Sequence, residues 1–245
     1  FGTQLKYGVV ADYGAKKDLL QDLLLFYSAK QQKMVTLVEY VEAMPEDQKS
    51  IFFATGEAID RLAKRPIVNT VLGKGFDVLL CPQDVDEFCF MSMNEDQEKP
   101  FKNVAGGDLG LETEDEKSAA EAITKENEGL FAEMQKALDD KVKRVAVSAR
   151  LTDTPSCVTA EGPITLEMEK ILAQGPDGEH VKSDRVLELN AEHPVFKAVQ
   201  KAFEDGDTEK VHLYATILYD QALITEGLPI DDPVAYTQAV YKFMA

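Results

Sequence analysis

Apolar and polar positions change their period along the chain, and the changes divide it into segments. Residues 16–27 (KKDLLQDLLLFY) are dense in leucine and predict a helix. Thr36 and Glu39 have the T-x-x-E spacing of a capping box, which predicts a short helix over residues 37–44 that ends before Pro45. The first part of the chain is therefore predicted to start with helices.

Short apolar runs follow and alternate with helical segments. Residues 51–55 (IFFAT) and 76–81 (FDVLLC) have the length and composition of buried strands, and residues 100–104 predict a weaker strand. Helices are predicted after Gly56 and from Asp84 onward. Strands that alternate with helices predict a small α/β layered unit with a largely parallel sheet.

The acidic segment 108–140 predicts a solvated helix with one apolar face, preceded by a loop at residues 105–116. The apolar positions on this face are Ile123, Leu130, Met134 and Leu138. A domain boundary is predicted near residues 139–141, because the period of two typical of a strand begins just after them.

Beyond this boundary the pattern predicts a mixture of strands and helices. Strands are expected at residues 142–149 and after Pro155. The remaining expected elements are a helix at 163–175, a polar loop at 174–183, a short strand at 186–190, and closing helices at 194–204, 208–226 and 233–244. The fold class predicted for the whole chain is α+β: a small α/β unit in residues 1–140, then a mixed strand–helix domain in residues 141–245 that ends in a helical bundle.

The charge of the chain argues against some classes of partner. A formal net charge of -18 repels phosphate backbones and anionic lipid surfaces, so no nucleic acid and no membrane is expected as a partner. No apolar run approaches the length of a membrane span. Cys81, Cys89 and Cys157 have neither disulfide-framework nor metal-site spacing, so we expect reduced, mostly buried thiols in a cytoplasmic protein, and no metal site.

No convincing catalytic constellation is visible. Gly73 and Gly75 precede a strand, so they do not have the placement of a dinucleotide-binding loop. Ser148 and Arg150 fall on the same side of a predicted strand, which an ordinary sheet contact explains. The alternative is a small-molecule α/β enzyme whose pocket lies at the carboxyl ends of the strands 51–55 and 76–81, beginning at Thr55, Gly56 and Glu57.

Two apolar segments are candidates for binding other chains. One is a helical stripe of Ile164, Met168, Ile171 and Leu172. The other is the segment 87–93, which is apolar almost all round, so that Phe88 or Met91 is expected to face outward. For both segments the alternative is plain core packing.

The closing helices have more apolar width than one supporting helix needs. A bundle shared by two copies of the chain would bury the excess, and a monomeric helical core is the alternative. The residues expected at such a dimer contact are Tyr214, Leu218, Ala222, Leu223, Val240 and Tyr241.

Several segments, in order along the chain, resemble the Hsp90 (heat shock protein 90) chaperone family in its bacterial form. They include IFFATGE, GFDVLLCPQDVDEF, LEMEKILAQ and LELNAEHPVFK, and the most specific are VKRVAVSARLTDTPSCV and YDQALITEGLPIDDP. The resemblance implies the distal part of the family's middle domain in residues 1–140 and its carboxy-terminal dimerisation domain in residues 141–245. A start at Phe1 instead of Met fits a fragment of a longer protein.

The resemblance also implies a function. The family's members are ATP-driven homodimeric chaperones that bind unfolded or partly folded client proteins, and the matching client-contact positions here are Glu87, Phe88 and the helix around residues 166–172. On this basis we expect a fragment that is no enzyme and binds no cofactor, with ATP and magnesium confined to the full-length parent. Since the chain ends at YKFMA, no tail motif for helical-repeat co-chaperones is expected. A purely structural dimerisation module is the third possibility.

Overall fold

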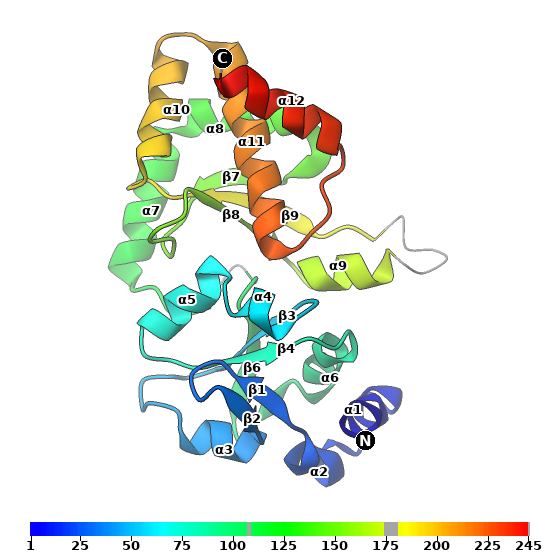
Figure 1. Ribbon diagram of the computed structural model, residues 1–245. Helices are drawn as coiled ribbons and strands as arrows, with labels where there is room; N and C mark the ends of the chain where they lie inside the picture. The colour runs from blue at the N-terminus through cyan, green and yellow to red at the C-terminus, as the bar shows by residue number, and fades with distance from the viewer. Residues whose placement is uncertain (107–108, 174–180, 245) are drawn as a thin grey trace. The chain divides into compact units, whose positions relative to one another are not determined.

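The chain folds into two compact units, each with its own sheet and core (Figure 1). The computed structural model describes residues 1–106, 109–173 and 181–244. Unit 1 is Phe1–Leu109 and unit 2 is Gly110–Ala245. Both units combine helices with mixed sheets, so the fold class is α+β, as predicted.

Unit 1 consists of short helices around one mixed sheet (Figure 1). Its helices are α1 (Gly2–Ala11), α2 (Lys17–Leu20), the 3-10 helix η1 (Gln21–Leu23), α3 (Leu37–Glu42), α4 (Ile59–Leu62), α5 (Pro66–Gly73) and α6 (Val85–Met93). Its strands are β1 (Phe26–Ser28), β2 (Lys33–Val35), β3 (Ile51–Thr55), β4 (Val78–Cys81), β5 (Glu95–Asp96) and β6 (Lys99–Asn103). They lie in the order β2-β1-β4-β3-β6-β5.

The sheet of unit 1 is parallel only at its centre. Strand β3 pairs in parallel with β4 on one side and β6 on the other. Strand β1 pairs antiparallel with β2 and with β4. The prediction of a largely parallel sheet is therefore right for the central strands only, because β1 and β2 are joined by a short turn, and a tight turn can join only antiparallel strands.

The leucine-dense segment 16–27 is not one helix, and the prediction there is wrong. Helix α2 is followed directly by η1, and strand β1 begins at Phe26. Phe26 is buried, and its ring lies 4.7 Å from that of Phe90. Burial in the sheet therefore overrides the helical propensity of the leucines. The hairpin strand β2 and helix α1 are elements that the pattern did not predict.

Helices cover both faces of the sheet over its central strands. On one face Phe53, Leu79 and Cys81 pack with residues of α1, α3 and α6 in a single cluster. The alternate residues of β3 and β4 point to the other face, where α4 and α5 bury their own apolar residues. Toward β1 and β2 this second face opens, since Tyr27 is half-buried and Met34 is exposed.

Unit 2 is a three-stranded sheet with helices (Figure 1). Its helices are α7 (Glu114–Glu126), α8 (Glu128–Leu138), the 3-10 helix η2 (Asp139–Lys141), α9 (Leu166–Leu172), α10 (Pro194–Glu204), α11 (Thr208–Glu226) and α12 (Pro233–Met244). Its strands are β7 (Arg144–Val147), β8 (Ser156–Glu161) and β9 (Asp184–Leu189). Strand β9 is central, parallel to β7 and antiparallel to β8.

The acidic segment is two helices that pack in unit 2. Helix α7 starts with the capping box of Thr113 and Glu116 and ends at Glu126, and α8 begins at Glu128 after the single residue Asn127. The predicted stripe is real in α8, where Leu130, Met134 and Leu138 are buried. Because α8 contacts α11 and β7, the compact units divide between residues 109 and 110, earlier than the domain boundary predicted near residues 139–141.

The remaining elements of unit 2 follow the predicted order with shifted ends. Helix α9 begins after Thr165, whose hydroxyl accepts a hydrogen bond from the Met168 amide, so Pro163 lies outside the helix. Most of the predicted loop at 174–183 lies outside the described residues. Helices α10, α11 and α12 are confirmed, and α11 ends at Gly227 with φ of 73°, a left-handed conformation that glycine adopts without strain.

Candidate functional site

Helix α6 is held in unit 1 by the carboxylate of Glu87. This side chain is buried, and it accepts hydrogen bonds from Thr55 Oγ1 at 2.7 Å and Asn103 Nδ2 at 2.8 Å. Both donors lie at the carboxyl ends of the parallel strands β3 and β6. Glu87 was predicted to contact clients, but in this structure it fixes α6 to the sheet and does not reach the surface.

The next residues of α6 divide between core and surface. Phe90 is buried among the rings of Phe26, Phe53 and Phe101, at centroid distances of 4.7, 4.4 and 4.6 Å. Phe88 is half-buried and Met91 is 51% exposed. The expectation that one large side chain of this segment faces outward is met by Met91.

The apolar stripe predicted on and just before α9 has one buried member and three partly exposed ones. Met168 is buried, whereas Ile164, Ile171 and Leu172 are half-buried. The stripe predicted for client binding is therefore part core and part surface. Its accessible portion is Ile164, Ile171 and Leu172.

A charged network anchors α9 to the rest of unit 2. Arg185 on β9 donates to Glu169 Oε1 at 2.9 Å and to the Tyr219 hydroxyl at 2.6 Å, while Ser183 Oγ donates to Glu169 Oε2 at 2.5 Å. The salt bridge between Arg185 and Glu169 is mostly shielded from water. Helix α9 is thus fixed in place while Ile171 and Leu172 stay partly accessible.

Four of the six residues predicted for dimer contact lie in the core of a single chain. Tyr214, Leu218, Ala222 and Leu223 of α11 are buried. They pack inward because α11 is surrounded by α8, α10, α12 and β8. The sequence could not separate these positions from a shared surface, since α11 is apolar on several sides.

Helix α12, unlike α11, lies at the surface of unit 2. None of its described residues is buried; Val240 is half-buried and Tyr241 is 68% exposed. Phe243 packs edge-on against Tyr214 at 4.9 Å, and Lys242 pairs with Glu209. Val240 and Tyr241 are therefore the predicted dimer residues that a second chain could reach.

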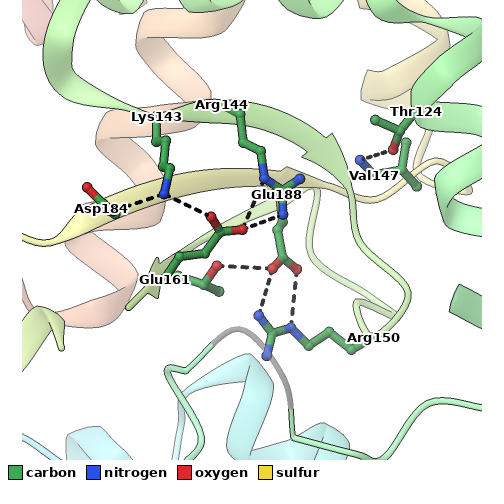
Figure 2. Close-up of polar contacts among 9 residues, drawn as sticks. Thr124, Lys143, Arg144, Val147, Arg150, Glu161, Asp184 and Glu188 are labelled. Carbon is green, nitrogen blue, oxygen red and sulfur yellow. Dashed lines mark hydrogen bonds and ion pairs between the residues drawn. The ribbon is translucent and has the colours of Figure 1, made fainter. Parts of the chain in front are cut away.

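A buried ion pair lies at the sheet of unit 2 (Figure 2). The sequence indicated only one of its partners, Arg150. Arg150 Nη2 lies 2.7 Å from Glu188 Oε1, and Glu188 also accepts from Ser148 Oγ at 2.7 Å and Thr159 Oγ1 at 3.0 Å. Burial acts to raise the pKa of Glu188, but the Arg150 guanidinium and these donors outweigh it and lower the pKa. The predicted shared side of Ser148 and Arg150 is confirmed, and their partner Glu188 was missed.

The three thiols are buried and free, as predicted. Burial raises the pKa of Cys89 to about 12 and that of Cys81 and Cys157 well above the usual value, so each is an unreactive thiol. No group of three or more His, Cys, Asp or Glu within residues 1–106, 109–173 and 181–244 is placed to hold a metal ion.

Each unit has a small pocket among its described residues. The unit 1 pocket has a volume of about 250 Å³ and is lined by Lys6, Tyr27, Met34 and Asp86 among others. The unit 2 pocket has about 300 Å³ and lies where Phe243 and Lys242 of α12 meet the start of α11. Nothing in the sequence pointed to the first pocket, because Lys6 and Asp86 are far apart in the chain.

The comparisons with known proteins identify the family. The family model described as Hsp90 protein matches residues 1–245. The chain belongs to the Hsp90 family. It is 51% identical to the chaperone protein HtpG of Bacillus licheniformis over 245 residues, and 49% identical to HtpG of Bacillus subtilis and of Clostridium botulinum (strain Langeland) over 244 residues.

Each of these matches covers the whole chain and 39% of the relative. The chain therefore spans well under half the length of the HtpG chaperones it matches. The resemblance to the bacterial Hsp90 proteins is confirmed, and the expectation of a heat-shock chaperone sequence is confirmed with it.

Two expectations about Hsp90 chemistry are wrong on this finding. From the sequence we expected that this fragment is not an enzyme and binds no cofactor, and that only the full-length parent binds ATP and magnesium. The Hsp90 model matches all of residues 1–245, and the HtpG relatives align along the whole chain. ATPase activity and the binding of ATP and magnesium are therefore not excluded for this chain. They are properties to be tested on it.

The two pockets named above have about 250 and 300 Å³, at or just below the lower end of the roughly 300–1,000 Å³ usual for ligand pockets. No metal-holding group is present in the part of the chain that the structure describes.

Among the described residues, no helix is both long and apolar enough to cross a membrane.

Proposed function

We propose that this chain is the client-binding and dimer-forming part of an HtpG-type chaperone of the bacterial cytoplasm. In this proposal residues 1–140 correspond to the distal part of the family's middle domain and residues 141–245 to its carboxy-terminal dimerisation domain. The partners are unfolded or partly folded proteins and a second copy of the chain. The net charge of -18 disfavours nucleic acid and anionic membranes as partners.

The observation that carries this proposal is a set of apolar side chains left accessible on firmly held helices. Met91 projects from α6 while Glu87 and Phe90 fix that helix to the core. Ile171 and Leu172 are partly exposed on α9 while the ion pair of Glu169 and Arg185 holds it. Contiguous apolar surface typically marks sites that bind other chains, and in this proposal the partly exposed Ile164, Ile171 and Leu172 supply such a surface at α9.

Aggregation of a heat-denatured test enzyme, such as citrate synthase, tests client binding. The chain is expected to reduce light scattering by the denatured enzyme, and Met91→Glu with Ile171→Glu is expected to abolish most of that effect. Both positions are at least partly exposed, so the double variant should keep its fold, which circular dichroism checks. Leu19→Glu is the matched control, because Leu19 is 73% exposed on another element.

Equal protection by the double variant and the control would exclude these helices as the client surface. If the unmodified chain and both variants all fail to protect the denatured enzyme, client binding is wrong, and the purely structural dimerisation module remains. A small-molecule enzyme is not favoured, since Thr55, which was to start its pocket, is engaged with Glu87.

Dimerisation is carried by α12 in this proposal. Its exposed residues Val234, Tyr241 and Met244 give an apolar helix surface that a second copy would bury. Light scattering should give the mass of two chains, and Tyr241→Glu should shift the mass toward one chain while Leu19→Glu leaves it unchanged. A monomer at tens of micromolar for the unmodified chain would overturn this part.

A further inference from the structure

The pocket of unit 1 lies on the open part of the sheet, beside an edge strand. Tyr27 of β1 is paired with Met34 of β2 on one side and with Leu80 of β4 on the other. Residues paired across strands point to the same face, so these three side chains form one row. Helix α4 reaches the pocket only with Ile59, which leaves the outer end of the row open. Leu25 and Met34 at that end are 45% and 51% exposed.

The closed end of the pocket contains a buried ion pair. Lys6 Nζ lies 2.6 Å from Asp86 Oδ1, 3.1 Å from Gln83 Oε1 and 4.4 Å from the centre of the Phe26 ring. Lys6 and Asp86 are almost fully buried. The two charges cancel, so the pocket offers polar groups without a net charge. A neutral ligand is favoured over an anion or a cation, because a charged ligand would find no unpaired counter-charge there.

Strand β2, whose Met34 lines this pocket, has one edge that pairs with no other strand among the described residues. It is the last strand of its sheet in the described part of the chain, and it pairs only with β1. Its outer side carries backbone donors and acceptors of the kind to which an extended peptide adds as a further strand. A side-chain pocket next to a free strand edge is the combination used in such recognition, in which the backbone gives affinity and the pocket selects side chains.

We propose that β2 and its pocket bind an extended, uncharged stretch of polypeptide, with one large apolar side chain between Leu25 and Met34. The volume of about 250 Å³ is suited to one such side chain and falls below that of usual cofactor pockets. The choice of occupant rests on the proposed function, because partly unfolded proteins are the partners that present extended apolar segments. Neither Met91 of α6 nor any residue of α9 lines this pocket.

Titration of the whole chain with acetyl-Ser-Thr-Leu-Thr-Ser-amide, followed by NMR, tests this proposal. We expect the methyl signal of Met34 and the backbone amide signals of residues 33–35 to shift. The same peptide with Ser in place of Leu should bind with an affinity lower by a factor of about ten or more, since it loses one buried leucine side chain. A version with N-methylated backbone amides should bind about fivefold more weakly, since it cannot donate to β2.

Variants locate the site. Met34→Glu is expected to weaken the binding of the leucine peptide about tenfold, and Leu19→Glu, on the neighbouring helix α2, should leave it unchanged. Equal binding of the leucine and serine peptides, or shifts confined to residues away from 25–35, would overturn the proposal. So would unchanged binding to the Met34→Glu chain.

These outcomes are distinct from failure of the proposed function. If the chain protects citrate synthase from aggregation but the peptide does not shift Met34, the strand-edge site is wrong and the chaperone function stands. If the peptide shifts Met34 but no protection is seen, the site stands and the chaperone function is wrong.

Discussion

Removal of the Arg150 charge is the sharpest structural perturbation that the fold of unit 2 offers. In Arg150→Met, the guanidinium that faces Glu188 at 2.7 Å is lost, while the carboxylate stays in the sheet (Figure 2). Breaking a buried ion pair from one side costs about 3–5 kcal/mol. Glu188 keeps donors from Ser148 and Thr159, and its side chain is 13% exposed. We therefore expect the lower end, about 3 kcal/mol.

Urea unfolding measures this loss. With a slope of about 2 kcal/mol per molar urea, 3 kcal/mol corresponds to a midpoint lower by about 1.5 M. Because the chain has two compact units, two transitions are expected, and only that of unit 2 should move. Adding Glu188→Leu to Arg150→Met should restore much of the loss, since no unpaired charge then remains in the sheet.

The effect should depend on pH in a defined direction. The pKa of Glu188 in the folded chain is lowered from its usual value of 4.5. Its ionised form therefore contributes stability that is complete above pH 4.5 and is lost as the pH falls through the folded pKa. The difference between the unmodified chain and Arg150→Met should shrink below pH 4.5.

Arg144→Met is the matched control. Arg144 pairs with Glu161 at 2.6 Å on the same sheet, but these side chains are 50% and 32% exposed (Figure 2). Exposed pairs contribute about 0–1 kcal/mol, so the midpoint should move by less than about 0.5 M. Equal shifts for the two variants would refute the reasoning, because burial would then not distinguish the two ion pairs.

Two further predictions concern single buried polar groups. The hydroxyl of Tyr40 donates to the Asp77 carbonyl at 2.6 Å and accepts from Gln48 at 2.9 Å. Tyr40→Phe should therefore lower the free energy of unfolding of unit 1 in urea by about 1–3 kcal/mol. Tyr13→Phe, at an exposed residue, should cause no measurable loss. Burial raises the pKa of Asp220 above its usual value of 3.8, so its charged form destabilises the fold at neutral pH. Asp220→Asn should raise the midpoint of unit 2 at pH 7 and have no such effect below pH 3.8, and a lower midpoint at pH 7 would show that nearby Lys141 dominates.

Elements with a strong local signal could be predicted from the sequence. The strand Ile51–Thr55 has an unbroken apolar run, and it is found at those residues. The capping box of Thr36 and Glu39 is present with both of its hydrogen bonds. These features depend on near neighbours in the chain, so a single sequence contains the information.

Features that depend on distant residues could not be predicted. The segment 16–27 has helical composition, but Phe26 joins the ring cluster around Phe90 and becomes part of a strand. The sequence of α6 showed a large apolar segment, yet it could not show that Glu87 turns inward to Thr55 and Asn103. Lys6 and Asp86 likewise form their pair only once α1 packs against α6.

The most direct measurement of the central claim is cross-linking of a denatured client to chosen positions of the chain. A photoreactive benzoylphenylalanine is placed at position 91, 171 or 19, and the chain is irradiated with heat-denatured citrate synthase. We predict cross-links from positions 91 and 171, and only background from position 19 and from native citrate synthase. Equal yields from all three positions, or none from 91 and 171, would contradict the claim that α6 and α9 bind partly unfolded chains.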